Sequence, residues 1–303
     1  MRLFFVALMS CLFLTGCAVT VDEPQTSREE YEKSLGTTNV PLPLDDAIYV
    51  EQTKREKIVE KLEEFFQLDW LSRKELDARE IHYLALGDSL TRGIGDEYNR
   101  YGYTVRLAEK LEQWPAITKV QLDNRGKRGR RSDQLLELLE KGHYDKELAQ
   151  ADLITITMGG NDVMKIVKSD IFSLRKEMFD AERDDFNVRY AKIINAIRER
   201  NAEVPLILIG FYNPFSIITD EVTPFESIIF EWNEDIEMLA NEDVNACFVP
   251  VSDLFETNED MVYHTDFFHP NAAGYEKMTE RIAITMKQCG IEEMSDGLIG
   301  FEE

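Results

Sequence analysis

Three residues of the chain have the side chains needed to transfer an acyl group. Ser89 carries a hydroxyl that can attack a carbonyl carbon, but a neutral serine is a weak nucleophile and needs a base. His269 can accept the hydroxyl proton near neutral pH and return it to the leaving group. Asp266 precedes the histidine by three residues, a spacing that a turn can close, and can hold the imidazole in one tautomer. We therefore predict these residues as nucleophile, base and acid.

Acyl transfer also needs hydrogen-bond donors for the negative oxygen of the tetrahedral intermediate. Ser89 stands in a Gly-Asp-Ser-Leu turn, where its own N–H can face the same point as its hydroxyl. Gly129 lies in a glycine-containing segment whose backbone N–H is free to turn into a cleft, and Asn161 offers a side-chain amide. We predict these three residues as the oxyanion donors.

The surrounding sequence predicts the elements that position these groups. Short apolar runs occupy 82–86, 119–122, 153–157, 205–209 and 247–251, and helical stretches follow at about 101–113, 131–141, 171–200, 225–240 and 272–288. Five strands that alternate with helices predict an α/β fold with a parallel sheet covered on both faces. In such sheets ligands bind outside the carboxyl ends of the strands. The candidate segments follow the first, second, third and fifth runs, so we expect them to converge there.

These segments, taken in order, resemble the consensus blocks of the GDSL/SGNH hydrolase family over about residues 80–290. The family's serine, glycine, asparagine and histidine match Ser89, Gly129, Asn161 and His269, and its triad acid matches Asp266. The resemblance implies a flavodoxin-like three-layer α/β/α sandwich, an esterase or lipase activity and no cofactor. It also implies that the aspartate before Ser89 is a structural residue of the turn.

The first residues predict a secretory signal and a membrane anchor. Arg2 precedes the apolar run 3–14, which is too short for a membrane span and is typical of a secretory signal. Leu-Thr-Gly-Cys ending at Cys17 resembles the lipobox of bacterial lipoproteins, which implies cleavage after residue 16 and lipid on Cys17. We expect a lipid-anchored protein on the extracytoplasmic face of the cell membrane. Residues 17–45 are then a polar tether and 46–79 a lead-in helix, and the hydrolase domain spans 80–290 with an acidic tail at 291–303.

Charge narrows the range of partners. The formal net charge of −24 disfavours nucleic acid or bare anionic lipid as a partner of the whole surface. Residues 125–131 are the exception, because five of the seven are basic. Arg128 and Arg130 flank Gly129 and could attract an anionic ester, although a solvated loop neutralised by acidic neighbours is the simpler interpretation.

Cysteines and histidines add little further chemistry. Cys247 and Cys289 could form one disulfide in an oxidising compartment, but two buried free thiols are the simpler expectation. The four histidines are scattered and no His/Cys group has metal-ligand spacing, so no metal site is predicted.

Several functions stay open on these residues. The leading prediction is a serine esterase or lipase for acyl esters, including a lysophospholipase type, with an acyl lipid or an acetylated envelope polymer as substrate. The aromatic segment 211–225 could form an acyl-pocket wall or simply pack in the core. The same triad would serve a carbohydrate deacetylase or a thioesterase, and a tethered protein that only binds an envelope ligand is the alternative outside catalysis.

Overall fold

The structure is a computed structural model that describes Lys61 and residues 78–169, 172–216, 223–256 and 261–301. The chain divides into two units, Met1–Ser72 and Arg73–Glu303, and every element below belongs to the second. The predicted leader, tether and nearly all of the lead-in helix lie outside the described residues. The boundaries given for those segments therefore stay predictions.

Five parallel strands form one sheet in the order β2-β1-β3-β4-β5. The strands are β1 (Arg79–Gly87), β2 (Ile117–Gly126), β3 (Leu153–Thr157), β4 (Leu206–Ile209) and β5 (Ala246–Val249). Gly87 at the end of β1 pairs with Gly126 of β2 on one side and with Thr157 of β3 on the other. The carboxyl ends of these three strands therefore meet at one edge, where the strand order reverses and ligands bind in doubly wound sheets.

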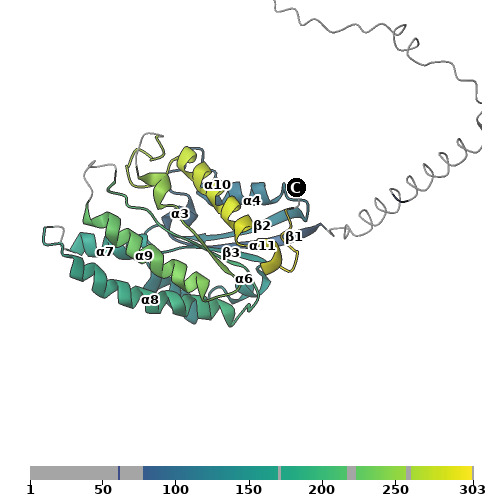
Figure 1. Ribbon diagram of the computed structural model, residues 1–303, viewed down its shortest axis with the longest axis horizontal. Coiled ribbons are helices and arrows are strands. Elements are labelled where there is room, and N and C mark those ends of the chain that lie inside the picture. Colours follow the sequence, from purple (N-terminus) through teal and green to yellow (C-terminus); the bar gives the residue numbers. More distant parts are fainter. Residues whose placement is uncertain (1–60, 62–77, 170–171, 217–222, 257–260, 302–303) are drawn as a thin grey trace, which may run out of the picture. The chain divides into compact units, whose positions relative to one another are not determined.

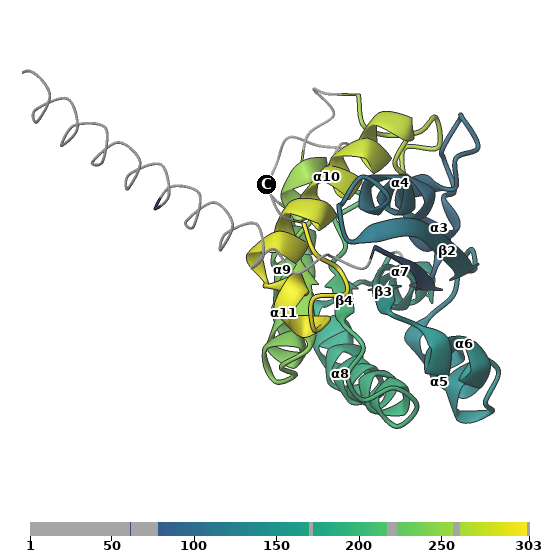
Figure 2. The same cartoon turned by 90° about the vertical axis from the view of Figure 1, so that its right-hand side faces the viewer.

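Helices cover both faces of this sheet, which gives three layers (Figures 1 and 2). One face is covered by α5 (Ser132–Glu140), α6 (Asp145–Gln150), α7 (Gly160–Ser169), α8 (Lys176–Arg198) and α9 (Pro224–Asn241). The other is covered by α3 (Ser89–Arg92), α4 (Gly102–Leu111), the 3-10 helix η1 (Ser252–Phe255), α10 (Ala272–Gln288) and α11 (Ile291–Met294). The predicted α/β/α sandwich with a five-stranded parallel sheet is confirmed.

Strand residues alternate between the two cores. In β4, Leu206 and Leu208 pack with the helices of the first face, whereas Ile207 and Ile209 pack with those of the second. All four are fully buried, which explains why the strand appears in the sequence as a continuous apolar run without polar alternation.

The predicted helical stretch over about 171–200 corresponds to α8. The prediction missed a separate helix before it, α7, which begins at Gly160 shortly after β3. Two adjacent glycines favour a loop, but Val163, Ile166 and Val167 form a buried stripe at helical spacing.

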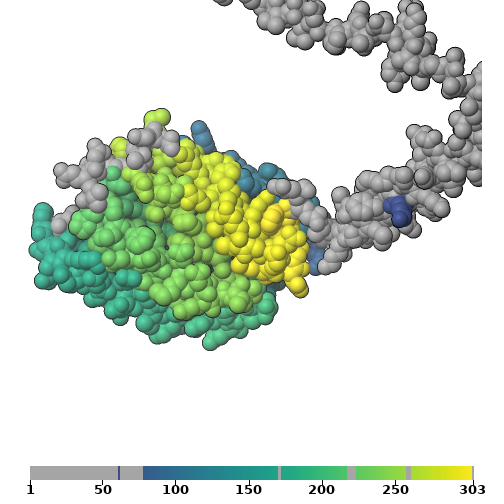
Figure 3. Space-filling model, viewed as in Figure 1, coloured from purple at the N-terminus to yellow at the C-terminus, as the bar shows by residue number. Residues whose placement is uncertain are grey.

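The expected acidic tail at 291–303 is also incorrect for its described part, 291–301. Ile291 and Ile299 are fully buried in the second core, and Phe301 packs against Trp114. Figure 3 shows the yellow C-terminal atoms continuous with the surface of the domain. The many acidic residues of this segment suggested an exposed tail, but its apolar residues pack in the second core.

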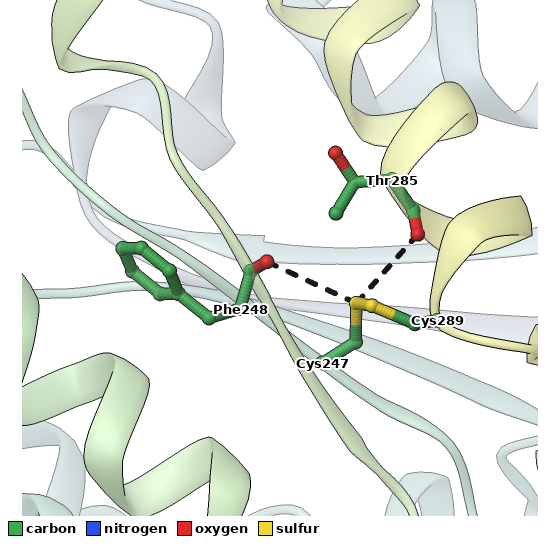
Figure 4. The surroundings of a disulfide bond; sticks show 4 residues. All are labelled: Cys247, Phe248, Thr285 and Cys289. Atoms are coloured by element: carbon green, nitrogen blue, oxygen red, sulfur yellow. Dashed lines mark hydrogen bonds between the residues drawn. A yellow bond between two sulfur atoms is a disulfide. The ribbon is translucent and has the colours of Figure 1, made fainter.

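Cys247 of β5 and Cys289 at the end of α10 form a disulfide, so the expectation of two free thiols is wrong (Figure 4). The two Cα atoms lie 6.1 Å apart across a sequence separation of 42. Closing a loop of this length restricts the unfolded chain and stabilises the domain by about 4 kcal/mol in the chain-entropy model. The bridge joins the edge strand to the helix that follows the candidate triad segment.

No helix in the described part of the chain is both long enough and apolar enough to cross a bilayer.

Candidate active site

Ser89 sits at the N-terminus of α3, directly after β1. Only glycine fits at Gly87, because a Cβ there would come within 2.3 Å of Thr157 Oγ1. Asp88 caps the helix by accepting a hydrogen bond from the Leu90 N–H at 2.9 Å. The turn therefore presents Ser89 at the strand edge, and Asp88 has the structural position expected of it.

Asp266 and His269 are held together by a turn of the loop before α10. Asp266 Oδ1 accepts hydrogen bonds from the Phe268 and His269 N–H groups at 3.1 and 3.0 Å. Phe267 between them has a φ of 53°, which lets the chain fold back within three residues. The Tyr212 hydroxyl donates to the Phe268 carbonyl at 2.8 Å and fixes this turn to the end of β4. Nothing in the sequence pointed to Tyr212 in that role.

The structure brings Ser89, His269 and Asp266 into one chain of hydrogen bonds. His269 Nε2 lies 3.0 Å from Ser89 Oγ, and its Nδ1 lies 2.7 Å from Asp266 Oδ2. Ser89 and His269 are both buried, with 4% and 5% of their surface exposed. An ionised carboxylate at Nδ1 keeps the proton on that nitrogen, which leaves Nε2 free to accept the serine hydroxyl proton.

Protonation states suit this arrangement. Burial raises the pKa of Asp266, but hydrogen bonds from the His269 backbone and ring outweigh it and lower the pKa to about 2. Burial lowers the pKa of His269 below 6.5, and the positive charge of Arg128 adds to this, whereas Asp266 acts in the opposite direction. At neutral pH the pair is therefore a carboxylate beside a neutral imidazole, the form that can act as a base.

Asn161 reaches the same site, but its amide is already in use. It lies in the first turn of α7 and lines a pocket together with Ser89. Its Nδ2 donates to Asp88 Oδ2 at 3.2 Å and to the Arg130 carbonyl at 3.1 Å. Because Nδ2 carries only two hydrogens, an oxyanion beside Ser89 would have to replace one of these partners.

Gly129 lies beside this group without lining the pocket. It is exposed, with a φ of 78°, and a Cβ there would meet no atom within 4 Å. The residue after Gly129 is Arg130, and its carbonyl accepts a hydrogen bond from the Asn161 side chain. The structure therefore joins the Gly129 segment to the Asn161 side of the site and, within the described residues, shows no hydrogen bond between Gly129 and Ser89.

A buried carboxylate that the sequence analysis did not single out ties these segments together. Asp162 Oδ1 accepts from the Ser132 hydroxyl at 2.6 Å, and Asp162 Oδ2 accepts from the Ser132 N–H at 3.1 Å. Arg189 of α8 donates to both Asp162 and Ser132. The starts of α5 and α7 are thereby joined, which holds the loop of Gly129 next to Asn161.

The basic segment divides into buried, paired and unpaired side chains. Arg130 is buried, and its guanidinium donates to the Gly87 carbonyl and the Tyr144 hydroxyl. Its expected role in binding substrate is therefore wrong, because the side chain packs beneath the turn. Arg125 pairs with Asp123 and Glu147, and Arg131 pairs with Asp133. Arg128 is exposed and forms no ion pair within the described residues.

An apolar pocket opens beside Ser89, with a cavity volume of about 40 Å³. Phe211, Tyr212 and Pro214 line it, so the start of the aromatic segment 211–225 forms a pocket wall. Phe225 packs instead against Phe179 in the core. The pocket is completed by side chains from other elements, which are Leu90, Val163, Met164, Ile229 and Phe268. An acyl chain on a carbonyl held at Ser89 would enter this space.

Among the described residues, no group of three His, Cys, Asp or Glu side chains could hold a metal ion.

Comparison with known proteins gives a family match over most of the domain. Residues 85–277 match the GDSL-like Lipase/Acylhydrolase family. The uncharacterized protein YpmR of Bacillus subtilis is 34% identical over 209 residues, which are 68% of this chain and 82% of YpmR. The spore germination lipase LipC of Bacillus licheniformis is 27% identical over 218 residues, 67% of this chain and 94% of LipC.

Solved structures share the fold. The lipase Lip_vut3 from a goat rumen metagenome superimposes with a TM-score of 0.58 at 25% identity, over 69% of this chain and 97% of that one. A family 3 carbohydrate esterase of Clostridium thermocellum gives a TM-score of 0.52 at 17% identity, over 73% of this chain and all of that one (100%). The second likeness concerns the fold alone.

The surroundings of His269 predict its titration. Its ring should titrate below the ordinary value of 6.5, because burial disfavours the imidazolium. Arg128→Ala should move the pKa upward, since a repelling positive charge is removed. NMR titration of the ring, assigned with His269→Gln, measures both values. A pKa above 6.5 that does not respond to Arg128→Ala would contradict this description of the site.

Proposed function

The chain belongs to the GDSL-like lipase/acylhydrolase family of ester hydrolases, and we propose on this basis that it cleaves acyl esters with Ser89 as nucleophile. The observation that carries the proposal is the hydrogen-bond chain from Ser89 Oγ through His269 to Asp266, at 3.0 and 2.7 Å. This is the arrangement that activates a serine hydroxyl.

The reaction follows from that geometry in two halves. Ser89 Oγ attacks the carbonyl carbon while His269 Nε2 takes the hydroxyl proton, and Asp266 stabilises the imidazolium. The intermediate collapses as His269 protonates the leaving alcohol, which leaves the acyl group on Ser89. Water then attacks the acyl-serine, His269 takes its proton, and the acid leaves as Ser89 regains a proton.

We propose that the oxyanion accepts hydrogen bonds from the Ser89 and Gly129 N–H groups and from the Asn161 side-chain amide. Asn161 supports this assignment because it lines the pocket together with Ser89 and its Nδ2 donates to the neighbouring Asp88. Formation of the oxyanion would draw one N–H away from Asp88 or from the Arg130 carbonyl. Loss of a single such donor typically lowers the rate about 10²–10³-fold.

Ser89→Ala should abolish ester hydrolysis and covalent labelling by a fluorophosphonate probe, because both need the serine oxygen. Hydrolysis of short p-nitrophenyl esters and probe labelling measure this. Ser227→Ala is the matched control, since Ser227 is exposed on α9 and lines no part of the pocket. Hydrolysis that survives in a folded Ser89→Ala protein, or a wild type that binds esters but never reacts with the probe, would refute the proposal.

The proposed substrate is a lipid ester with a short acyl chain, and its proposed place of action is the outer face of the cytoplasmic membrane. LipC and Lip_vut3 are both named as lipases, and the pocket beside Ser89 is apolar. The Leu-Thr-Gly-Cys segment supports lipid attachment at Cys17. The bridge between Cys247 and Cys289 supports an oxidising compartment, because disulfides persist outside the reducing cytosol.

Lipidation predicts that a bacterial host expressing the full chain incorporates labelled palmitate into it, and that Cys17→Ser removes the label. Cys11→Ser is the matched control, because Cys11 lies in the segment that cleavage before Cys17 discards. Gel fluorography of the purified chain is the measurement. A chain that stays unlabelled in wild type, or a labelled Cys17→Ser variant, would argue against the anchor.

Arg128 is proposed to favour esters with a negative charge on the alcohol side. Its charge already acts on His269, so it lies close enough to influence a bound ester. Arg128→Ala should lower the ratio of kcat/KM for an anionic glycerophosphoester to that for a neutral monoacylglycerol with the same acyl group by up to about fivefold, as expected of an exposed charge pair. Arg125→Ala removes an equal charge that is already paired and should leave the ratio unchanged. An equal ratio in wild type and Arg128→Ala ends this idea.

A further inference from the structure

The pocket beside Ser89 ends at a wall that it shares with a second cavity. Ile229 of α9 lines both spaces and is itself buried. The second cavity has a volume of about 280 Å³, against about 40 Å³ on the Ser89 side. A small space that touches the proposed nucleophile is thus separated from a larger one by a short barrier.

Two structural features contribute to the barrier, and only one of them is a single side chain. Asn213 faces the second cavity and Pro214 the first, so the chain itself forms part of the wall. This turn is fixed, because Asn213 Oδ1 accepts from the Phe215 N–H at 2.9 Å and Asn213 Nδ2 donates to Glu226 at 3.0 Å. The side chain of Ile229 also belongs to the wall, because it lines both spaces.

The second cavity can accept an apolar chain although several polar residues line it. Glu226 is satisfied by the hydrogen bonds that cap α9, and the Ser216 hydroxyl donates to the Phe255 carbonyl at 2.7 Å. Most of the cavity surface is apolar, with Ile229, Phe230 and Phe255 among the lining residues. The Glu226 and Ser216 side chains are already paired and do not need water, so an alkyl chain can replace water beside them and along the apolar side chains.

The size of the first space limits what fits without the second. A water molecule needs at least about 10–15 Å³ of such volume, so 40 Å³ holds about three atoms of methylene size. An acetyl to butyryl group fits, and an octanoyl chain does not.

We infer that Ile229 sets the acyl-chain limit of the site, so that the wild-type chain acts on short acyl esters and loss of the Ile229 side chain opens the larger cavity to medium-length acyl chains. The inference rests on the proposed esterase function and adds its acyl specificity. The side chain acts as a partition and takes no part in the bond-making steps.

The test compares kcat/KM for p-nitrophenyl octanoate and p-nitrophenyl butyrate in wild type, Ile229→Ala and Ile228→Ala. Ile228 is the matched control, since it is the adjacent isoleucine of the same helix, equally buried at 3% exposure, and lines neither cavity. The octanoate-to-butyrate ratio should rise about tenfold or more in Ile229→Ala, a usual size for a methylene-scale change in an apolar pocket. It should stay at the wild-type value in Ile228→Ala.

Each outcome separates this inference from the proposed function. A wild type that reacts with neither ester nor fluorophosphonate removes the proposed function itself. An active wild type that already prefers octanoate, an unchanged ratio in Ile229→Ala, or an equal rise in Ile228→Ala overturns the partition alone. Should Ile229→Ala not fold, Ile229→Val keeps the test decisive, because it should raise the ratio in the same direction by a smaller amount.

Discussion

The hydrogen bond between His269 Nε2 and Ser89 Oγ joins residues 180 positions apart, and the rest of the site depends on it. Its two ends belong to different parts of the fold. Ser89 follows the interior strand β1, whereas His269 stands in a loop between the edge strand β5 and α10. A contact of this kind needs both a rigid sheet and a loop whose path is determined at several points.

The positions of the segments around the site are fixed by hydrogen bonds of polar groups that are themselves buried. Burial raises the pKa of Asp88 to about 6, although hydrogen bonds from the Leu90 N–H and the Thr157 hydroxyl act against this. Asp162 is likewise buried, with a raised pKa for the same reason. A buried carboxylate destabilises the folded protein unless each of its oxygens has a hydrogen-bond partner. The partner groups can therefore occupy only a small range of positions. The geometry around Ser89 follows from satisfying them.

Much of the architecture could be predicted from the sequence because buried parallel strands are continuous apolar runs. All five predicted runs became strands, and the match to known families confirms the expected class of enzyme. The end of β2 was predicted too early, at residue 122 in place of Gly126. An edge strand is only partly buried, so its polar second half gives no apolar signal.

The sequence could not show where individual side chains point or how far apart two residues lie in the folded protein. Five basic residues in seven looked like one patch, but a guanidinium can point inward as easily as outward, and Arg130 points inward to the Gly87 carbonyl. Cys247 and Cys289 gave no sign of meeting, because their separation depends on how α10 packs on β5. Ile229 is one of several apolar residues on α9, and only the cavities on its two sides distinguish it.

The disulfide has a topological consequence for the catalytic loop. Asp266 and His269 lie between the two bridged cysteines, so they belong to a covalently closed ring of the chain. A single cut by a protease within that ring, for example at the exposed Phe267, would leave both fragments attached to the same molecule. The loop that carries the proposed base could then be nicked without being lost by diffusion.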